Sequence, residues 1–213
     1  MKILPINDRL NKKYSCPKIQ NNKGFTGLHR INNAEFNELL DYIVNSKQKS
    51  AGGKKQEIKI NGIPTTYTII DERDYVLKSK DNQIKAYMNV VPVKKFHFEY
   101  SNKFYTKNSG AVSIEMFLSK GNGAGSFLIK EAVKLSKKLG FDGRVVVYAS
   151  PMGKSANTPI PFYHKMGFRA STKYDEERIE KAIREYNKTG IYTQPLTAAM
   201  YLDEKYINRY IYD

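Results

Sequence analysis

Residues 120–125, Lys120-Gly121-Asn122-Gly123-Ala124-Gly125, decide the fold because of what stands on either side of them. An apolar, alternating run over 111–118 leads into this stretch, and a helical pattern over 127–139 leads out of it. Three glycines between a strand and a helix allow a sharp turn and direct several backbone N–H groups at one point, beside the positive end of the helix dipole. The arrangement suits a pyrophosphate group, although a glycine-rich loop alone is weak evidence.

Size and composition indicate one globular domain with an elaborated arm. The chain has 213 residues, of which 40% are hydrophobic, and a formal charge of +15. Such an excess of Lys and Arg attracts polyanions, or else it covers a solvated surface without a partner. No apolar run approaches the roughly 20 residues that span a bilayer, no secretory signal is visible, and the single cysteine, Cys16, predicts no disulfide. These features predict a cytoplasmic location.

The hydrophobic periodicity predicts a mixed sheet with helices. The expected strands are 25–31, 57–60, 65–70, 75–80, 84–91, 111–118, 144–150 and 196–202, and the expected helices are 33–45, 124–139, 158–166 and 173–187. Asn61-Gly62 and Asp81-Asn82 predict two hairpin turns. We therefore expect an α/β (α+β) domain over 26–213, with its cofactor core at about 75–205, behind a basic irregular arm over 1–25.

The order of strand, glycine-rich loop, long helix, buried strand and short helix resembles the general-control-related N-acetyltransferase (GNAT) superfamily. In that family a loop of the type Arg/Gln-x-x-Gly-x-Gly/Ala follows the fourth strand and binds the pyrophosphate of acetyl-CoA. Residues 120–125 fit this loop, with Lys120 in place of Arg or Gln. A later family motif, Asn-x-x-Ala-x-x-Phe-Tyr-x-x-x-Gly-Phe, is matched by Asn157, Phe162-Tyr163 and Gly167-Phe168. The resemblance is sharp over 111–168 and absent over about 1–55.

The resemblance implies acetyl-CoA as co-substrate and an N-acetyltransferase activity. The fourth strand splays from the fifth in this family, and its backbone pairs with the pantetheine arm. The cofactor-binding residues implied are Met116, Phe117, Leu118, Lys120, Gly121, Asn122, Gly123, Ala124, Gly125, Ser126 and Asn157. The segment before the glycine loop is shorter than usual in the family and lacks the common proline, which leaves the residues at the acetyl group open by one or two positions.

Two residues are candidates for the chemistry itself. Tyr163 falls where the family commonly places the general acid that protonates the CoA thiolate; its alternative role is a core aromatic beside Phe162. Glu115 is the only ionisable residue inside an apolar strand, where burial is costly unless the group is used or paired. It is a candidate base, or else it pairs with a lysine or faces solvent. His97 and His164 are weaker candidates, and three isolated histidines predict no metal site.

The acceptor stays open between a protein amine, the aminoacyl group of a tRNA and a small metabolite amine. The positive charge favours a macromolecular acceptor and argues mildly against polycationic ones. A different class remains possible on the same fold, namely a non-catalytic module that senses acyl-CoA or binds a nucleic acid or protein. Release of CoA in the presence of an acceptor distinguishes an enzyme from such a module.

Overall fold

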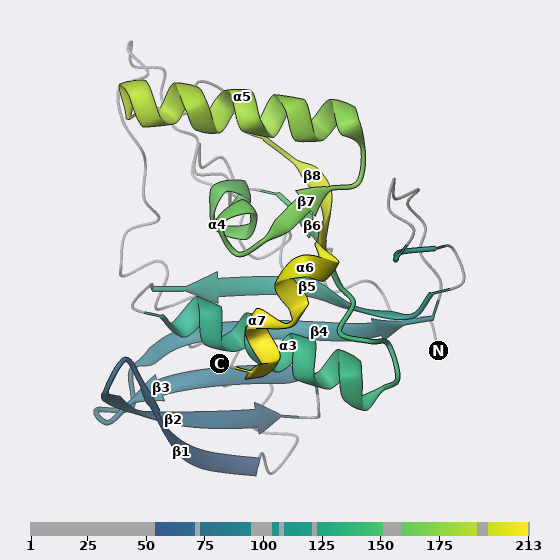
Figure 1. Ribbon diagram of the computed structural model, residues 1–213. Coiled ribbons are helices and arrows are strands. Elements are labelled where there is room, and N and C mark those ends of the chain that lie inside the picture. Colours follow the sequence, from purple (N-terminus) through teal and green to yellow (C-terminus); the bar gives the residue numbers. More distant parts are fainter. Residues whose placement is uncertain are drawn as a thin grey trace, which may run out of the picture.

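The computed structural model describes residues 54–70, 73–94, 104–106, 109–120, 123–150, 159–190 and 196–212. They form one eight-stranded sheet in the order β1-β2-β3-β4-β5-β6-β8-β7, with helices packed against it (Figure 1). The strands are β1 (Lys54–Ile60), β2 (Ile63–Ile70), β3 (Asp74–Ser79), β4 (Ile84–Val93), β5 (Ala111–Ser119), β6 (Val145–Ala149), β7 (Phe168–Ala170) and β8 (Ala198–Leu202). The helices are α3 (Ala124–Lys138), α4 (Ile160–Lys165), α5 (Lys173–Thr189), α6 (Glu204–Ile207) and α7 (Arg209–Tyr212). The mixed sheet with flanking helices confirms the predicted fold class, while the arm over 1–25, the domain start at 26 and the elements expected over 25–45 lie outside the described residues.

Strands β1 to β5 form an antiparallel meander, and both predicted hairpins are present. Ile60 pairs with Ile63, so Asn61-Gly62 is a two-residue turn. Asn61 and Gly62 both have positive φ, 50° and 78°, as the tightest hairpin turns require. Asn82, in the second hairpin, has a φ of 62°.

The second part of the sheet begins where β5 and β6 pair in parallel, joined by a crossover through α3. Strand β8 then pairs antiparallel with both β6 and β7. The three-residue strand β7 was not expected from the sequence, because a run this short carries no readable alternation.

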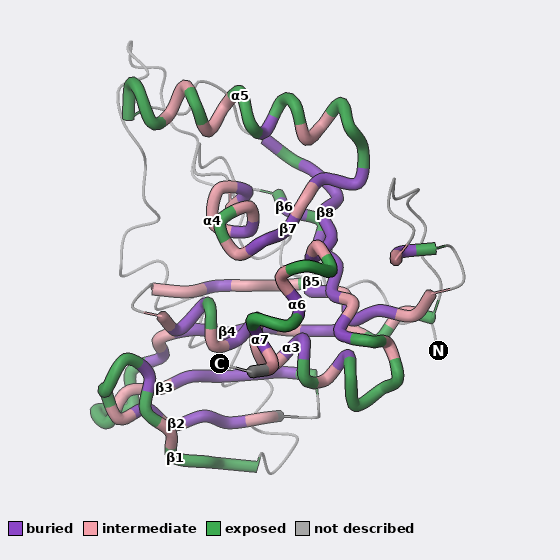
Figure 2. Tube along the Cα trace, viewed as in Figure 1, coloured by how far each residue is buried: buried purple, intermediate pink, exposed green. Residues whose placement is uncertain are grey.

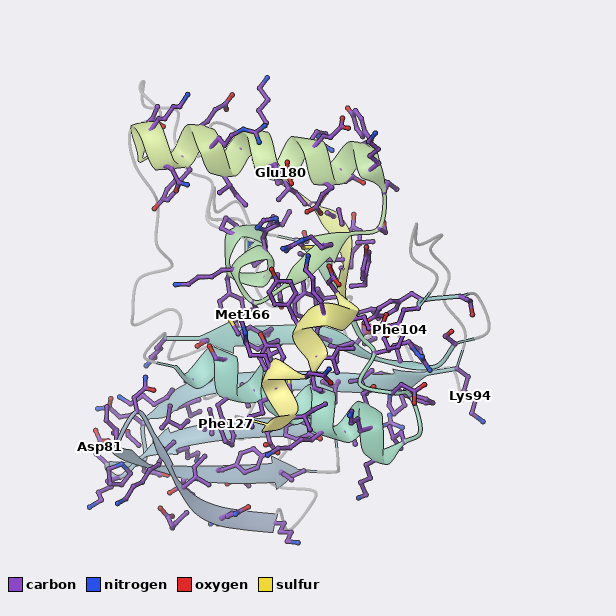
Figure 3. The ribbon with its side chains drawn as sticks, in the orientation of Figure 1. Asp81, Lys94, Phe104, Phe127, Met166 and Glu180 are labelled. Carbon is purple, nitrogen blue, oxygen red and sulfur yellow. The ribbon has the colours of Figure 1, made fainter. Side chains whose placement is uncertain are left out.

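Helix α3 covers one face of the central strands and forms the core with them (Figure 1). Its buried side is made by Leu128, Ile129, Ala132 and Val133, which are fully buried. At the start of the helix, Phe127 meets the ring of Tyr67 on β2 edge-on, with the ring centroids 5.2 Å apart (Figure 3). The α3 face of the sheet is therefore apolar and closely packed.

Helix α5 begins where the sequence predicts it. The side chain of Thr172 accepts a hydrogen bond from the N–H of Asp175 at 3.1 Å, which caps the helix. Most of its surface is exposed, and of its side chains only that of Ile179 is fully buried (Figure 2). None of the helices in the described part of the chain has the length and apolar character needed to cross a membrane.

Candidate functional site

The candidate site lies where β5 and β6 stop pairing. The two parallel strands pair only from Val112 with Val145 to Ile114 with Val147. Strand β5 continues to Ser119, while the rest of β6 pairs with β8 alone. We call this divergence beyond Ile114 and Val147 the fork. A parallel pair that opens in this way leaves the inner edge of one strand available to another extended group.

A β-bulge marks the start of the fork. On β4, Asn89 is opposite Met116 and Val90 is opposite Ile114, so Glu115 is the extra residue of β5. Its side chain is exposed and accepts a hydrogen bond from the hydroxyl of Ser113 at 2.7 Å. Of the alternatives that the sequence leaves open for Glu115, the exposed side chain agrees with a carboxylate that faces solvent, and the bulge places it outside the packed surface of the strand. Its role as a base stays a prediction.

The backbone of β5 beyond the bulge presents N–H groups to the fork. The N–H of Lys120 donates to the carbonyl of Lys85 on β4, at 2.9 Å. Hydrogen-bonding groups alternate sides along a strand, so those of Phe117 and Ser119 point away from β4, towards the fork. Of the side chains predicted here, Leu118 is buried, and Met116 and Phe117 are half-buried.

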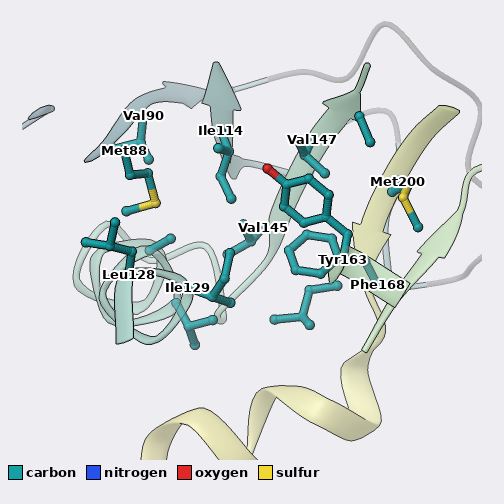
Figure 4. Packing of buried hydrophobic residues seen from close by; sticks show 14 of the residues in the cluster. Met88, Val90, Ile114, Leu128, Ile129, Val145, Val147, Tyr163, Phe168 and Met200 are labelled. Carbon is teal, nitrogen blue, oxygen red and sulfur yellow. The ribbon is translucent and has the colours of Figure 1, made fainter. Parts of the chain in front are cut away.

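Tyr163, on helix α4, brings a hydroxyl group to the fork. Its ring is 3% exposed and packs against those of Phe117, Phe162 and Phe168, at centroid distances of 5.3–5.8 Å. Pairing between β5 and β6 ends at Ile114 and Val147. In Figure 4 the ring of Tyr163 lies beside Val147, and its oxygen points towards Ile114.

Within the part of the chain that the structure describes, the hydroxyl of Tyr163 is not used. It has no hydrogen-bond partner among the described residues, and no buried polar side-chain atom there lacks a partner. The oxygen is therefore not completely buried, although only 3% of the residue is exposed. Burial of the ring raises the pKa of Tyr163 well above its ordinary value, so the group stays protonated at neutral pH.

The glycine turn is held by packing on both sides. Gly123 has a φ of 82°, a conformation that favours glycine, and a Cβ there would lie 2.7 Å from the amide nitrogen of Asn61. A Cβ on Gly125 would lie 2.9 Å from the ring of Phe162 and 3.3 Å from the hydroxyl of Ser119. The β1–β2 hairpin, the end of β5 and helix α4 thus all approach the turn closely.

The turn presents the start of α3 to an anion. Phe127 makes the first helical bond, to the carbonyl of Gly123, which leaves the N–H groups of Ala124, Gly125 and Ser126 outside the helical pattern. The first turn contains no acidic residue, so its dipole is not offset there. The hydroxyl of Ser126 lies 3.5 Å from the sulfur of Met166, labelled in Figure 3. The predicted contacts Gly121, Asn122 and Asn157 lie outside the described residues.

A polar cluster ties α4 to α5 beside the site. The Glu176 carboxylate accepts from the backbone N–H of Ala170 at 2.5 Å, lies 3.3 Å from His164 and lies 3.6 Å from the guanidinium of Arg169. Partial burial raises the pKa of Glu176, but these hydrogen bonds and the neighbouring charge outweigh burial and hold it below its ordinary value. His164, Glu176 and Glu180 also place potential metal-ligand atoms within 4.8 Å of one another. Glu176 already accepts a hydrogen bond from a backbone N–H and lies beside His164 and the Arg169 cation. We therefore interpret the cluster as a structural link between α4 and α5.

Reasoning from the sequence missed several contacts that build the site, including one made by Phe117, which was predicted only as a cofactor contact. Phe117 stacks on Phe162, with ring centroids 5.3 Å apart, and this contact joins β5 to α4. Asn61 supports the glycine turn from the hairpin. Tyr148, in the middle of a strand expected to be buried, is 58% exposed. Apart from the aromatic residues at 117 and 162, the sequence contains no pattern that predicts these contacts.

Comparison with known proteins gives structural neighbours only. No family model matches the chain, and no curated protein matches it. A point mutant of the AtaT toxin, bound to the C-terminus of the antitoxin AtaR and acetyl-CoA, has a TM-score of 0.39 and 17% identity, and the match covers 66% of this chain and 72% of that one. The Bacillus subtilis N-acetyltransferase YlbP, in complex with coenzyme A, has a TM-score of 0.34 and 14% identity over 61% of this chain and 66% of that one. Both TM-scores lie below 0.5, and nothing about the activity of this chain follows from them.

Proposed function

We propose that the chain is a GNAT-type N-acetyltransferase that uses acetyl-CoA as acetyl donor. One observation carries the proposal: the buried ring of Tyr163 directs an unused hydroxyl group to the point where β5 and β6 diverge. A hydroxyl group on a buried ring that has no partner among the described residues and is aimed at an open strand edge is available to a ligand.

The described residues fit the parts of such a donor. The inner edge of β5 at Phe117 offers backbone groups to an amide-containing arm, as a sheet edge does to an added strand. The N–H groups at the start of α3 face a pyrophosphate, and Lys120 adds a positive charge beside them. In this proposal the contacts predicted at 121, 122 and 157 complete the site.

The chemistry requires a neutral amine and a protonated leaving thiol. The amine nitrogen forms a bond to the acetyl carbon, the carbon–sulfur bond of the thioester breaks, and the electron pair leaves on sulfur. Tyr163 gives its proton to that sulfur and then regains one from solvent, while the surplus proton of the amine passes to a base. Glu115 is the candidate base, because it is an exposed carboxylate at the first residue of the fork.

The test uses acetyl-labelled acetyl-CoA and a cell lysate. Label is counted in the protein, RNA and small-molecule fractions for the wild type, for Tyr163→Phe and for Tyr174→Phe, a control at a tyrosine that is 70% exposed on α5. We expect a macromolecular fraction to be labelled, with a loss of 10²–10⁴-fold only in Tyr163→Phe, the usual contribution of a positioned acid. Binding of acetyl-CoA without label in any fraction would refute the enzyme and favour an acyl-CoA-sensing module.

A further inference from the structure

Lysines from neighbouring strands come together at the end of the sheet where the glycine turn begins. Lys78 lies near the end of β3, Lys85 lies near the start of β4, and Lys120 follows the last residue of β5. These strands are neighbours in the sheet, and Figure 1 shows the β3–β4 hairpin at the same end as the start of α3. The strands therefore bring three positive charges beside the turn that leads into α3.

The register places these lysine side chains on one face of the sheet. Leu77 and Ala86 belong to the core under α3. Side chains alternate along a strand, so the adjoining Lys78 and Lys85 point to the opposite face. Lys120 is the cross-strand neighbour of Lys85, to whose carbonyl its N–H donates. The register of β3 with β4 shifts after Leu77, and Lys85 is the extra residue that lies against Lys78. We call Lys78, Lys85 and Lys120 the lysine row.

The lysine row concentrates charge without an internal counter-ion. Cross-strand neighbours of like charge repel each other, which is unfavourable unless an anion lies between them. All three residues are half-buried, so solvent screens this repulsion less than it would at the open surface. Among the residues that the structure describes, no carboxylate forms an ion pair with Lys78 or Lys85. The row is therefore suited to an anion that comes from outside the chain.

Two carboxylates at this end of the sheet are held by hydroxyl groups. The hydroxyl of Ser79 donates to Asp81, and that of Thr66 donates to Glu57 at 2.8 Å. Both carboxylates are exposed, where their charges are well screened. Lys80, also exposed on the β3–β4 hairpin, adds a further positive charge. The positive charges thus outnumber the negative ones, and the local field favours an anion.

We infer that the lysine row binds the 3′-phosphate of the CoA donor, through Lys85 and Lys78. This inference rests on the proposed function, since it names a second contact of the same donor and a basis for its specificity. Coenzyme A carries a diphosphate and, on the ribose of its adenosine, a separate 3′-phosphate. The proposed diphosphate site is at the start of α3, and Lys120 directly precedes the glycine turn. Lys85 lies one strand further, about 4.8 Å across the sheet, and its flexible stem can carry the ammonium to the second phosphate.

A terminal phosphate fits the lysine row better than a nucleic acid does. A phosphomonoester carries about two negative charges at neutral pH, whereas each phosphodiester of a nucleic acid carries one. Two lysines on adjacent strands converge on one point and match the doubly charged group. The row also spans only about 10 Å, across three strands, which is short for a track that follows several phosphates. Binding of RNA to the row is therefore the competing outcome of the test.

The test compares the equilibrium binding of CoA with that of 3′-dephospho-CoA by titration calorimetry. Neither ligand carries an acetyl group, so the measurement does not depend on transfer. We expect the wild type to bind CoA at least about tenfold more tightly than 3′-dephospho-CoA, the lower end of what one charged hydrogen bond contributes. In Lys85→Met, which keeps an unbranched stem without the charge, most of this preference should be lost.

The two ligands together separate a lost contact from a damaged fold. We expect Lys85→Met to weaken CoA by about tenfold and to leave 3′-dephospho-CoA within about twofold, because only the former has the phosphate to lose. Lys85→Arg should keep the preference, since it keeps the charge, and Lys78→Met should reduce it independently. The matched control is Lys94→Met, which removes the same charge just beyond the other end of β4; Figure 3 labels Lys94 and Asp81 at opposite ends of the sheet.

The outcomes distinguish this inference from the proposed function. Equal affinities for the two ligands in the wild type, or a preference that survives in both Lys85→Met and Lys78→Met, would overturn the inference and leave the donor proposal standing. Binding of neither ligand would refute both. Equal affinities together with binding of a single-stranded RNA that is lost in Lys85→Met would assign the lysine row to a nucleic acid instead.

Discussion

The contact between Asn61 and Gly123 makes a quantitative prediction about the glycine turn. In Gly123→Ala the new methyl group would lie 2.7 Å from the amide nitrogen of Asn61 and 3.2 Å from the methyl group of Ile60. The substitution also forces alanine into a φ of 82°. Two separate penalties are therefore expected, one from the backbone conformation and one from the contact.

Gly140→Ala isolates the backbone penalty. Gly140 has a φ of 75°, close to that of Gly123, but nothing lies within 4 Å of its added Cβ. A left-handed alanine costs roughly 1–2 kcal/mol, and overpacking adds about 1–3 kcal/mol. We therefore expect Gly140→Ala to lower the free energy of unfolding by roughly 1–2 kcal/mol, and Gly123→Ala to lower it by at least about 1 kcal/mol more.

A double mutant tests the origin of the difference. Asn61→Gly removes the obstructing amide and tolerates the φ of 50° at that position. Unfolding in urea is measured for Gly123→Ala, Asn61→Gly, the double mutant and Gly140→Ala, with the midpoint and slope fitted for each. We expect the cost of Gly123→Ala in the Asn61→Gly background to fall to that of Gly140→Ala. Equal costs of Gly123→Ala in both backgrounds would show that the hairpin does not support the turn.

Three further predictions concern ionisable groups. Tyr163→Phe removes a hydroxyl that has no partner among the described residues, so it should change the free energy of unfolding in urea by less than about 0.5 kcal/mol. Tyr105→Phe loses a 2.7 Å hydrogen bond to the carbonyl of Leu202 and should lower the free energy of unfolding by about 1–3 kcal/mol in the same assay. Because burial raises the pKa of Tyr163, its hydroxyl keeps its proton as pH rises, so kcat for acetyl transfer should show no alkaline loss up to about pH 10, the ordinary pKa of tyrosine. A loss below that pH that is present in the wild type and absent from Tyr163→Phe would contradict the raised pKa. Because the pKa of Glu176 is lowered, its stabilisation is complete above the ordinary value of about 4.3 and is lost as pH falls through the folded value. The urea midpoint should therefore fall less in Glu176→Gln than in the wild type between about pH 7 and pH 3, and parallel curves would exclude this role.

Local patterns in the sequence predict most of the described elements. Asn61-Gly62 is a two-residue turn because both positions accept positive φ. Thr172 caps α5 because its side chain reaches the N–H three residues on. The alternating run before the glycine loop is β5, and its helical successor is α3. These features depend on residues that are close in the sequence, so their spacing is sufficient to find them.

The bulge at Glu115 could not be predicted in the same way. Regular alternation places residues 113, 115 and 117 on one face, but the extra residue shifts the face of everything that follows. Ser113 and Glu115 consequently share the face opposite α3, while Phe117 packs on the side of α4. A bulge is defined by the register with a neighbouring strand, and that register depends on β4, more than twenty residues away in the sequence.

The same bulge explains why the two proposed chemical groups approach the fork from opposite faces. Without the extra residue, Phe117 would lie on the same face as Glu115, opposite α3, and would lose its contacts with the rings of Phe162 and Tyr163. With the bulge, the aromatic packing that positions the hydroxyl of Tyr163 and the exposed carboxylate of Glu115 are compatible in the same strand. An acid and a base on opposite faces of one opening can act on the leaving sulfur and on the incoming amine without neutralising each other.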